Sequence, residues 1–150
     1  MGPNRAGAAL REARLSDIPR LETIRAAVRE NRLSDPRLVT PRDYEEHILG
    51  AGRTWVCEHD GQIVGFAAAN RDGRSIWALF VDPAHERRGI GRQLLDRAVE
   101  WLWSTGANAI ELGTAPGTRA ERFYLAAGWA PEGHTSRGEI LFRLARPPAP

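Results

Sequence analysis

Two arginines and two glycines stand close together in the stretch "FVDPAHERRGIGRQLL", between a run of apolar residues and a segment with helical spacing. The start of a helix leaves backbone N–H groups without partners and carries partial positive charge. Gly89 and Gly91 would let a ligand come close to the backbone because they have no Cβ atom, and Arg87 and Arg88 add charge and paired donors. Together these features suit a phosphate or, better, a pyrophosphate. The alternative is a tight strand–helix turn that binds no ligand and whose glycines only permit close packing.

Two other phosphate-binding motifs fit this turn less well. A P-loop needs a lysine, and all 21 basic side chains of the chain are arginines. A dinucleotide-binding turn would need a third glycine where Leu94 stands and should follow its strand at once. Glu111 does follow the turn at about the sequence separation of the acid that binds ribose in such proteins. A nucleotide-dependent enzyme, stabilised by NAD(P) or ATP but not by CoA, therefore stays as an alternative.

The elements that would position this turn can be read from spacing and turn residues. Helices are expected after Ser16, which could cap the first, after Thr40, which could cap the second, and over the apolar stripe from Leu94 to Leu102. A short last helix, "RAERFYLAA", should end at Gly128.

Strands are expected at "LREARL", at three successive segments between Thr54 and Val81 with Asp-Gly turns, at "AIEL" and at "EILFRL". Strands joined by hairpins come first and strand–helix–strand units follow. The sequence thus predicts an α/β (α+β) fold, a mixed sheet with helices packed on it, in one domain over residues 1–150 with flexible tails at 1–8 and 146–150.

Composition narrows the class of protein. The 21 basic and 19 acidic residues are balanced and the arginines are spread along the chain, so we expect no nucleic-acid partner. Cys57 is the only cysteine and is expected in the core, which favours a reducing, cytoplasmic location. No apolar run approaches the roughly 20 residues of a membrane span, so no membrane partner is expected. His47 and His59 are expected at solvated positions, and no His/Cys cluster predicts a metal site.

The turn and the last helix resemble one known family. "FVDPAHERRGIGRQLL" resembles the acyl-CoA-binding signature Q/R-x-x-G-x-G/A of the GNAT superfamily of N-acetyltransferases, and "RAERFYLAAGW" resembles the Phe-Tyr-x-x-x-Gly-Phe segment that follows it. The resemblance is specific from about Leu79 to Trp129. It implies a GNAT-like, mostly antiparallel sheet of about six or seven strands with about four helices. The implied activity is transfer of an acetyl group from acetyl-CoA to a primary amine, of a small molecule or a protein N-terminus, by direct attack in a ternary complex.

The resemblance also implies roles for particular residues. The strand that parts from "AIEL" would pair with the pantetheine arm through Leu79, Phe80 and Val81. Backbone N–H groups would wrap the pyrophosphate along Arg87, Arg88, Gly89, Ile90, Gly91 and Arg92. Ala120 and Phe123 would line the arm from the other side. Tyr124 would be the general acid that protonates the leaving thiolate, because a tyrosine with a pKa near 10 is protonated at neutral pH.

The sequence departs from the family pattern at two places. Glu86 stands where the family prefers Gln or Arg, and Gly117 where many members have an Asn that contacts the cofactor, so weaker or altered cofactor contacts are expected. The general base is not identified; Glu111, His134 and an ordered water are guesses. A non-catalytic acyl-CoA-binding or sensing domain of the same fold is therefore the main alternative.

The acceptor amine is expected opposite the cofactor, near the loop "RENRLSDP" and the final hairpin around "EGHTSRG". These segments hold Glu30, Asp35, Glu132 and His134, which could accept hydrogen bonds from a cationic amine. Trp103 and the closing strand could serve a homodimer.

Overall fold

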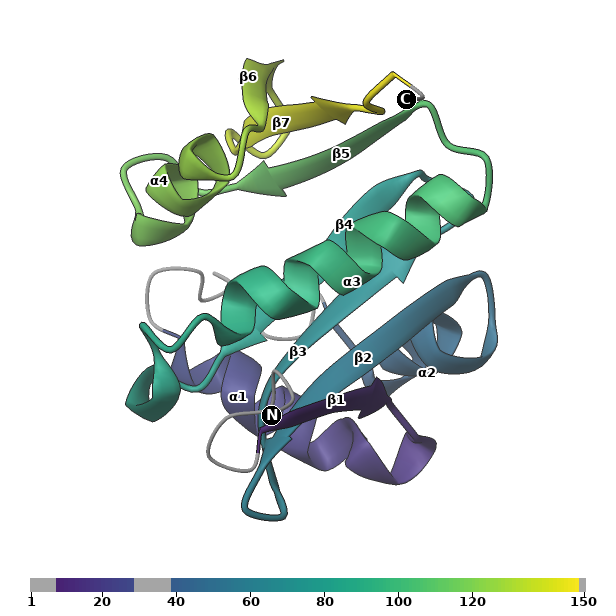
Figure 1. Cartoon of the computed structure of the whole chain (residues 1–150), viewed down its shortest axis with the longest axis vertical. Coiled ribbons are helices and arrows are strands. Elements are labelled where there is room, and N and C mark those ends of the chain that lie inside the picture. The colour runs from purple at the N-terminus through teal and green to yellow at the C-terminus, as the bar shows by residue number, and fades with distance from the viewer. Residues whose placement is uncertain (1–7, 29–38, 149–150) are drawn as a thin grey trace.

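A computed structural model describes residues 8–28 and 39–148 of the chain (Figure 1). In these residues seven strands form one sheet: β1 (Ala9–Glu12), β2 (Gly52–His59), β3 (Gln62–Asn70), β4 (Ser75–Val81), β5 (Ala109–Thr114), β6 (Ala130–His134) and β7 (Ile140–Ala145). The α-helices are α1 (Ile18–Ala27), α2 (Pro41–Leu49), α3 (Ile90–Ser104) and α4 (Arg119–Ala126), and two 3-10 turns span Leu15–Asp17 and Pro83–His85. The strand order is β1-β2-β3-β4-β5-β7-β6, and only the β4–β5 pair is parallel. The expected mixed, mostly antiparallel sheet with four helices is confirmed.

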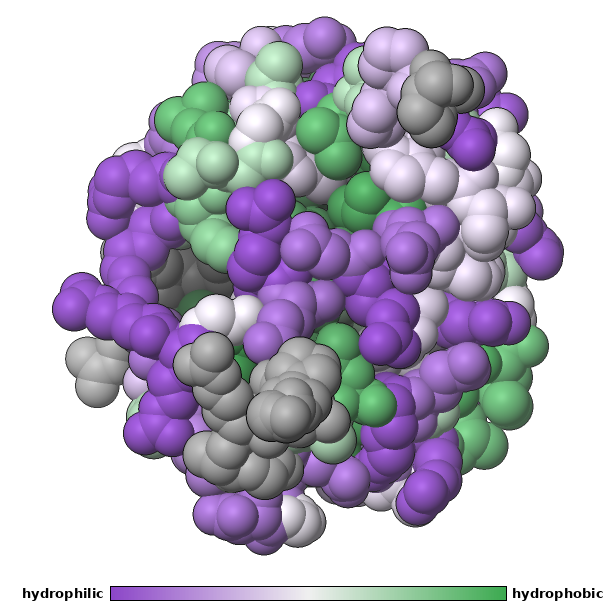
Figure 2. Space-filling model, in the orientation of Figure 1, coloured by the Kyte–Doolittle hydropathy of each residue, from purple (hydrophilic) through white to green (hydrophobic). Residues whose placement is uncertain are grey.

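Two apolar layers cover the faces of the sheet. Side chains alternate between the faces of a strand, so Trp55 and Cys57 of β2 pack with α3 while Val56 between them packs with α1 and α2. Figure 1 shows α3 lying across one face of the sheet, with α1 and α2 behind the other. Polar residues cover most of the face seen in Figure 2, and apolar ones form separate patches. No helix in the described ranges is long and apolar enough to cross a bilayer.

The N-terminal part of helix α3 lies close to the sheet. A Cβ atom on Gly65 of β3 would lie 3.2 Å from Cδ1 of Leu94 and 3.3 Å from Cγ2 of Ile90, so the missing side chain makes room for the helix. The predicted stripe is buried at Leu94, Leu95 and further along the helix. This packing fixes where the Arg/Gly turn meets the sheet.

Strands β4 and β5 pair at one position only. Their single paired position joins Ser75 to Glu111, whereas β5 pairs with β7 along its whole length, from Ala109 opposite Ala145 to Thr114 opposite Ile140. Beyond Ser75 no strand of the described residues pairs with the edge of β4 that faces β5. The expected parting of these two strands is thus present.

Several local expectations are confirmed. Asp60 and Gly61 both have positive φ, 53° and 79°, which is the turn type that favours Asp-Gly in hairpins. At the start of α2 the Asp43 carboxylate accepts a hydrogen bond from the Thr40 backbone N–H at 2.7 Å. Gly128 follows the last helix with φ of 94°, and Cys57 is fully buried.

Other local expectations are wrong. Ser16 does not cap α1, because a 3-10 turn over Leu15–Asp17 precedes the helix and Asp17 takes the cap position. His47 is buried rather than solvated, since its ring stacks on Trp77 with centroids 4.1 Å apart. Strand β6 is the first arm of the hairpin expected around "EGHTSRG", but its own bounds were not predicted, because it is short, exposed and glycine-containing and so lacks an apolar pattern. The loop "RENRLSDP" at 29–36 lies outside the described residues.

The C-terminal segment makes specific contacts near the expected tail. The backbone N–H of Arg146 donates to the Asn108 carbonyl at 2.9 Å, and its guanidinium donates to the Trp103 carbonyl at 3.1 Å. The same guanidinium lies 6.0 Å from the centre of the Trp103 ring. Arg146 therefore covers part of the tryptophan that was considered for a dimer contact.

Leu94→Ala should lower the free energy of unfolding by about 2–5 kcal/mol, because it leaves a cavity under the helix that carries the turn. Leu125→Ala is the matched control: Leu94 is 0% exposed and Leu125 46% exposed, so the control should change stability by less than about 0.5 kcal/mol. Urea denaturation measures both. Equal losses would contradict the packing of α3 described above.

Candidate active site

A cavity of about 330 Å³ opens between β4, the Arg/Gly turn and α4. The structure brings almost all of the predicted cofactor residues to its wall, which includes Leu79, Phe80, Val81, Arg87, Gly89, Ile90, Gly91, Arg92, Ala120 and Phe123. Tyr124 lines it as well. Arg88 is exposed and is not among the described residues of this wall. The spacing of the sequence thus corresponds to one continuous surface in space, which will be called the cofactor cavity.

The turn that borders the cofactor cavity has the backbone of an anion-binding turn. Arg87 and Gly89 adopt left-handed conformations, with φ of 65° and 78°, and Gly89 is the N-cap of α3. This conformation favours glycine at the second position. By helix geometry the first N–H groups of α3 have no partner within the helix and point out of its beginning. A negatively charged group is stabilised at such a place.

The space beside Gly91 is part of the cavity. A Cβ atom on this residue would contact Cγ2 of Val81 at 3.6 Å and Cζ of Phe123 at 3.8 Å. Both of these side chains line the cofactor cavity, so the bare backbone of Gly91 faces into it. The residues present therefore fit a ligand that needs close approach to the turn.

Glu86 and Gly117, the two residues that depart from the family pattern, both form hydrogen bonds with residues of α4. The Glu86 carboxylate accepts a 2.6 Å charged hydrogen bond from Nη1 of Arg119, the first residue of α4, and both residues line the cofactor cavity. The negative charge that Glu86 brings near the turn is thereby offset. Gly117 has φ of 75°, and its N–H donates to the Glu121 carboxylate at 2.6 Å, which stabilises the beginning of α4.

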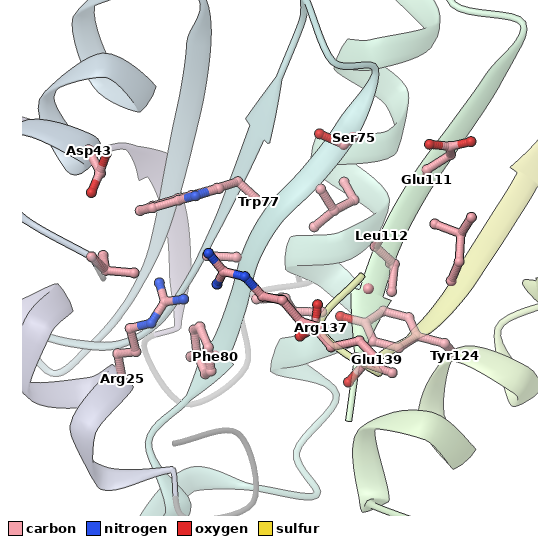
Figure 3. A pocket seen from close by; sticks show the side chains of 17 residues that line it. Arg25, Asp43, Ser75, Trp77, Phe80, Glu111, Leu112, Tyr124, Arg137 and Glu139 are labelled. Carbon is pink, nitrogen blue, oxygen red and sulfur yellow. The ribbon is translucent and has the colours of Figure 1, made fainter. Parts of the chain in front are cut away.

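A second cavity, of about 450 Å³, lies between β4, β5 and the ends of α1, α2 and β7 (Figure 3). Its charged lining residues are Arg25, Asp43, Glu111, Arg137 and Glu139. Tyr124, Leu79 and Phe80 line both cavities, so the two spaces meet at this tyrosine and at the free edge of β4. This second space will be called the acceptor cavity.

Tyr124 is held in a fixed aromatic environment. It is buried, and its ring centre lies 5.2 Å from Phe123, 5.8 Å from Trp129 and 5.9 Å from Phe142. Burial raises the pKa of the Tyr124 hydroxyl, because the low-dielectric surroundings disfavour the phenolate. The hydroxyl thus keeps its proton at neutral pH.

The carboxylates of the acceptor cavity were only partly foreseen. Glu111, one of three guesses for the base, lines this cavity, whereas His134 and Glu132 are exposed on β6 and are not among the described residues that line either cavity. Glu30 and Asp35 lie outside the described residues.

Sequence reasoning missed Glu139, whose Oε1 atom would lie 2.7 Å from a Cβ on Gly113. Among the described residues, no hydrogen bond or ion pair engages its carboxylate. It reaches the cavity only through the pairing of β7 with β5, which places Ile140 opposite Thr114.

The histidines offer little further chemistry. His85 lines the cofactor cavity, and its ring centre is 5.6 Å from that of His59. Burial lowers the pKa of His47, whose ring Nδ1 lies 2.8 Å from the Asp43 carbonyl. The described residues contain no group of three or more side chains that could hold a metal ion.

Comparison with known proteins agrees with this geometry. The acetyltransferase (GNAT) family profile matches residues 18–129. An uncharacterised N-acetyltransferase, MJ1207, of Methanocaldococcus jannaschii is 36% identical over 67 residues, which are 39% of this chain and 30% of that protein. The peptidyl-lysine N-acetyltransferase YiaC of Escherichia coli K12 is 43% identical over 47 residues, 31% of this chain and 32% of YiaC. The chain thus covers about a third of the length of these relatives.

The fold is shared with solved structures at low sequence identity. The crystal structure of the PaiA N-acetyltransferase from Thermoplasma acidophilum, in complex with coenzyme A, superposes with a TM-score of 0.80 at 15% identity. The match covers 93% of this chain and 99% of the other. The family profile matches most of the chain, including the Arg/Gly turn described above. The protein therefore belongs to the acetyltransferase (GNAT) family.

Proposed function

We propose that the chain is an acetyl-CoA-dependent N-acetyltransferase that acetylates a primary amine by direct attack in a ternary complex. The observation that carries this proposal is the position of Tyr124, buried where the cofactor cavity and the acceptor cavity meet. A proton donor at that junction can serve a group that leaves one cavity while a nucleophile enters from the other.

The cofactor cavity supports acetyl-CoA as the acyl donor. Its pyrophosphate would be held by backbone N–H groups along residues 87–92, with added charge from the arginines of the turn. Its pantetheine arm would lie along the free edge of β4 at Leu79, Phe80 and Val81, whose backbone groups lack a strand partner on that side. Ala120 and Phe123 of α4 would cover the arm from the opposite wall.

Acetyl-CoA supplies the acetyl group as a thioester, and the amine nitrogen forms the new bond to its carbonyl carbon while the carbon–sulfur bond breaks. Tyr124 donates its hydroxyl proton to the departing sulfur. A backbone N–H near Val81 would donate to the carbonyl oxygen, where negative charge develops. Glu139 would take the proton that the amine must lose, directly or through a water. Glu139 then releases its proton to solvent and the tyrosine regains one, which restores the enzyme.

Glu139 is favoured over Glu111 as the base by its place on the sheet. Glu111 lies at the one position where β5 is bonded to β4, whereas Glu139 lies against Gly113, further along β5 where the strands have parted. The parted end is also where Tyr124 and the free edge of β4 line both cavities.

Gly91→Leu should separate cofactor binding from stability. The new side chain would extend into the space between Val81 and Phe123, so affinity for CoA should fall by about tenfold or more. The free energy of unfolding of the unliganded protein should change by less than about 1 kcal/mol, because leucine favours a helix over glycine. Calorimetric titration with CoA and urea denaturation measure the two effects. Unchanged CoA affinity in a folded variant would contradict the cofactor assignment.

Tyr124→Phe should lower kcat for acetyl transfer by about 10²-fold or more, because it removes the proton donor and keeps the ring among its aromatic neighbours. CoA affinity, measured by the same titration, is the control and should not change. The reaction is followed by thiol release from acetyl-CoA across a panel of amines. Turnover equal to that of the unchanged protein would show that this tyrosine is not the acid.

Glu139→Gln should lower kcat/KM for the amine by about 10²-fold, because the amide cannot accept the proton. Glu111→Gln, which also removes one carboxylate from the acceptor cavity, is the matched comparison and should have a smaller effect. A larger loss in the Glu111 variant would transfer the role of base to that residue.

One class of acceptor amine is suggested by a relative. The match to YiaC, which acts on peptidyl-lysine by its name, favours a lysine side chain of a protein as the acceptor. Acetylation of lysine-containing peptides in preference to small amines would support it. Tight CoA binding without thiol release for any amine would instead favour a non-catalytic acyl-CoA-binding domain.

A further inference from the structure

We propose that the acceptor is a small amino carboxylate, a molecule with an anionic carboxylate near the amine that is acetylated, and that Arg25 binds this carboxylate. The inference rests on the proposed function, because it names the substrate class of the same acceptor cavity. Three observations support it. Arg25 has donors without hydrogen-bond partners among the described residues, the nearby carboxylate of Asp43 is bound by Thr40, and charged side chains of opposite sign line different sides of the cavity.

The Arg25 guanidinium is enclosed by aromatic rings and interacts with the Tyr44 hydroxyl. Its central carbon lies 4.8 Å from the centre of the Phe80 ring and 5.2 Å from that of Trp77. Its Nε and Nη1 atoms are shielded from solvent and have no hydrogen-bond partner among the described residues. A guanidinium cannot release its charge by losing a proton, and buried donors in native proteins nearly always have partners. The acceptor cavity thus contains a cation whose donors are incompletely used.

No carboxylate among the described residues neutralises this cation. Asp43, on the same cavity, already accepts hydrogen bonds from the Thr40 N–H at 2.7 Å and from the Thr40 hydroxyl at 3.1 Å. Tyr44 is buried beside it and packs edge-on against Trp77, with ring centres 5.3 Å apart. The described side chains around Arg25 therefore hold it in place without a carboxylate partner, and the carboxylate of a ligand can serve as its counter-ion.

The charges of the acceptor cavity are separated in a way that suits a zwitterion. Figure 3 shows Arg25 and Asp43 on the α1 side of β4, where Thr40 binds the Asp43 carboxylate, and Glu111 and Tyr124 on the other side. Glu139 lies against β5, near the expected site of acyl transfer, and Arg137 also lines the cavity. An ammonium group would be attracted to the β5 side and a carboxylate to Arg25. The volume of about 450 Å³ is that of a site for a small molecule.

Binding can test this proposal without acetyl transfer. The common L-amino acids, β-alanine and γ-aminobutyrate are titrated into the CoA-saturated protein, each beside its carboxamide, which keeps the amine and removes the carboxylate. Calorimetry measures affinity, and tryptophan fluorescence gives a second signal because Trp77 contacts Arg25. At least one amino acid should bind about tenfold or more tightly than its amide. Equal binding of every acid and amide, or no binding of any acid, would overturn the proposal.

A variant assigns the preference to Arg25. Arg25→Met keeps an unbranched side chain over the two rings and should abolish the preference for acid over amide. Arg42→Met, an exposed arginine of α2, removes the same charge and should leave the preference unchanged. Urea denaturation checks that both variants fold. A preference that survives in folded Arg25→Met would overturn the proposal, and if that variant does not fold, Arg25→Lys should show a weakened preference.

The two proposals fail in different ways. Acids that bind through Arg25 but release no thiol from acetyl-CoA would count against the acetyltransferase function and for this anion site. Thiol release with amines, together with equal binding of acids and amides, would support the enzyme and overturn the amino carboxylate.

Discussion

The parting of β4 and β5 is the constraint on which the rest of the site depends. One paired position, Ser75 with Glu111, holds the strands together, and β5 then follows β7 instead. An unpaired strand edge in the interior has a cost, since backbone donors and acceptors need partners. The described structure leaves this edge between two cavities, where a ligand with amide groups can supply the missing bonds. The fold thus creates a binding surface from main-chain atoms, which few substitutions can remove.

Charge is distributed around this opening in a consistent way. The beginning of α3 concentrates partial positive charge and arginine side chains where phosphates would lie, and Arg119 neutralises the one carboxylate of the turn, Glu86. The chemical centre at Tyr124 is apolar and aromatic, so its hydroxyl stays protonated. The acceptor cavity carries charges of both signs, at Arg25 and Glu139, that form no ion pair among the described residues. The regions proposed for cofactor binding, proton transfer and acceptor recognition are therefore neighbours with different electrostatics.

Local patterns in the sequence predicted the turn, and the family resemblance implied most of the residues of the cofactor cavity and Tyr124. Both are carried by two segments, each continuous in the sequence. Neither could predict Glu139 or Arg25. Glu139 reaches the site through the register of β7 on β5, and Arg25 through the packing of α1 beneath β4. His47 was misplaced for the same reason: its helical pattern does not reveal that Trp77, thirty positions further along, covers its ring.

The most direct test of the central claim is a crystal structure of the protein with CoA. The account predicts pyrophosphate oxygens within hydrogen-bond distance of backbone N–H groups between Arg87 and Arg92, with the pantetheine amides bonded to the free edge of β4. The thiol should end beside the Tyr124 hydroxyl. CoA bound elsewhere, or β4 and β5 closed on each other along their length, would contradict it.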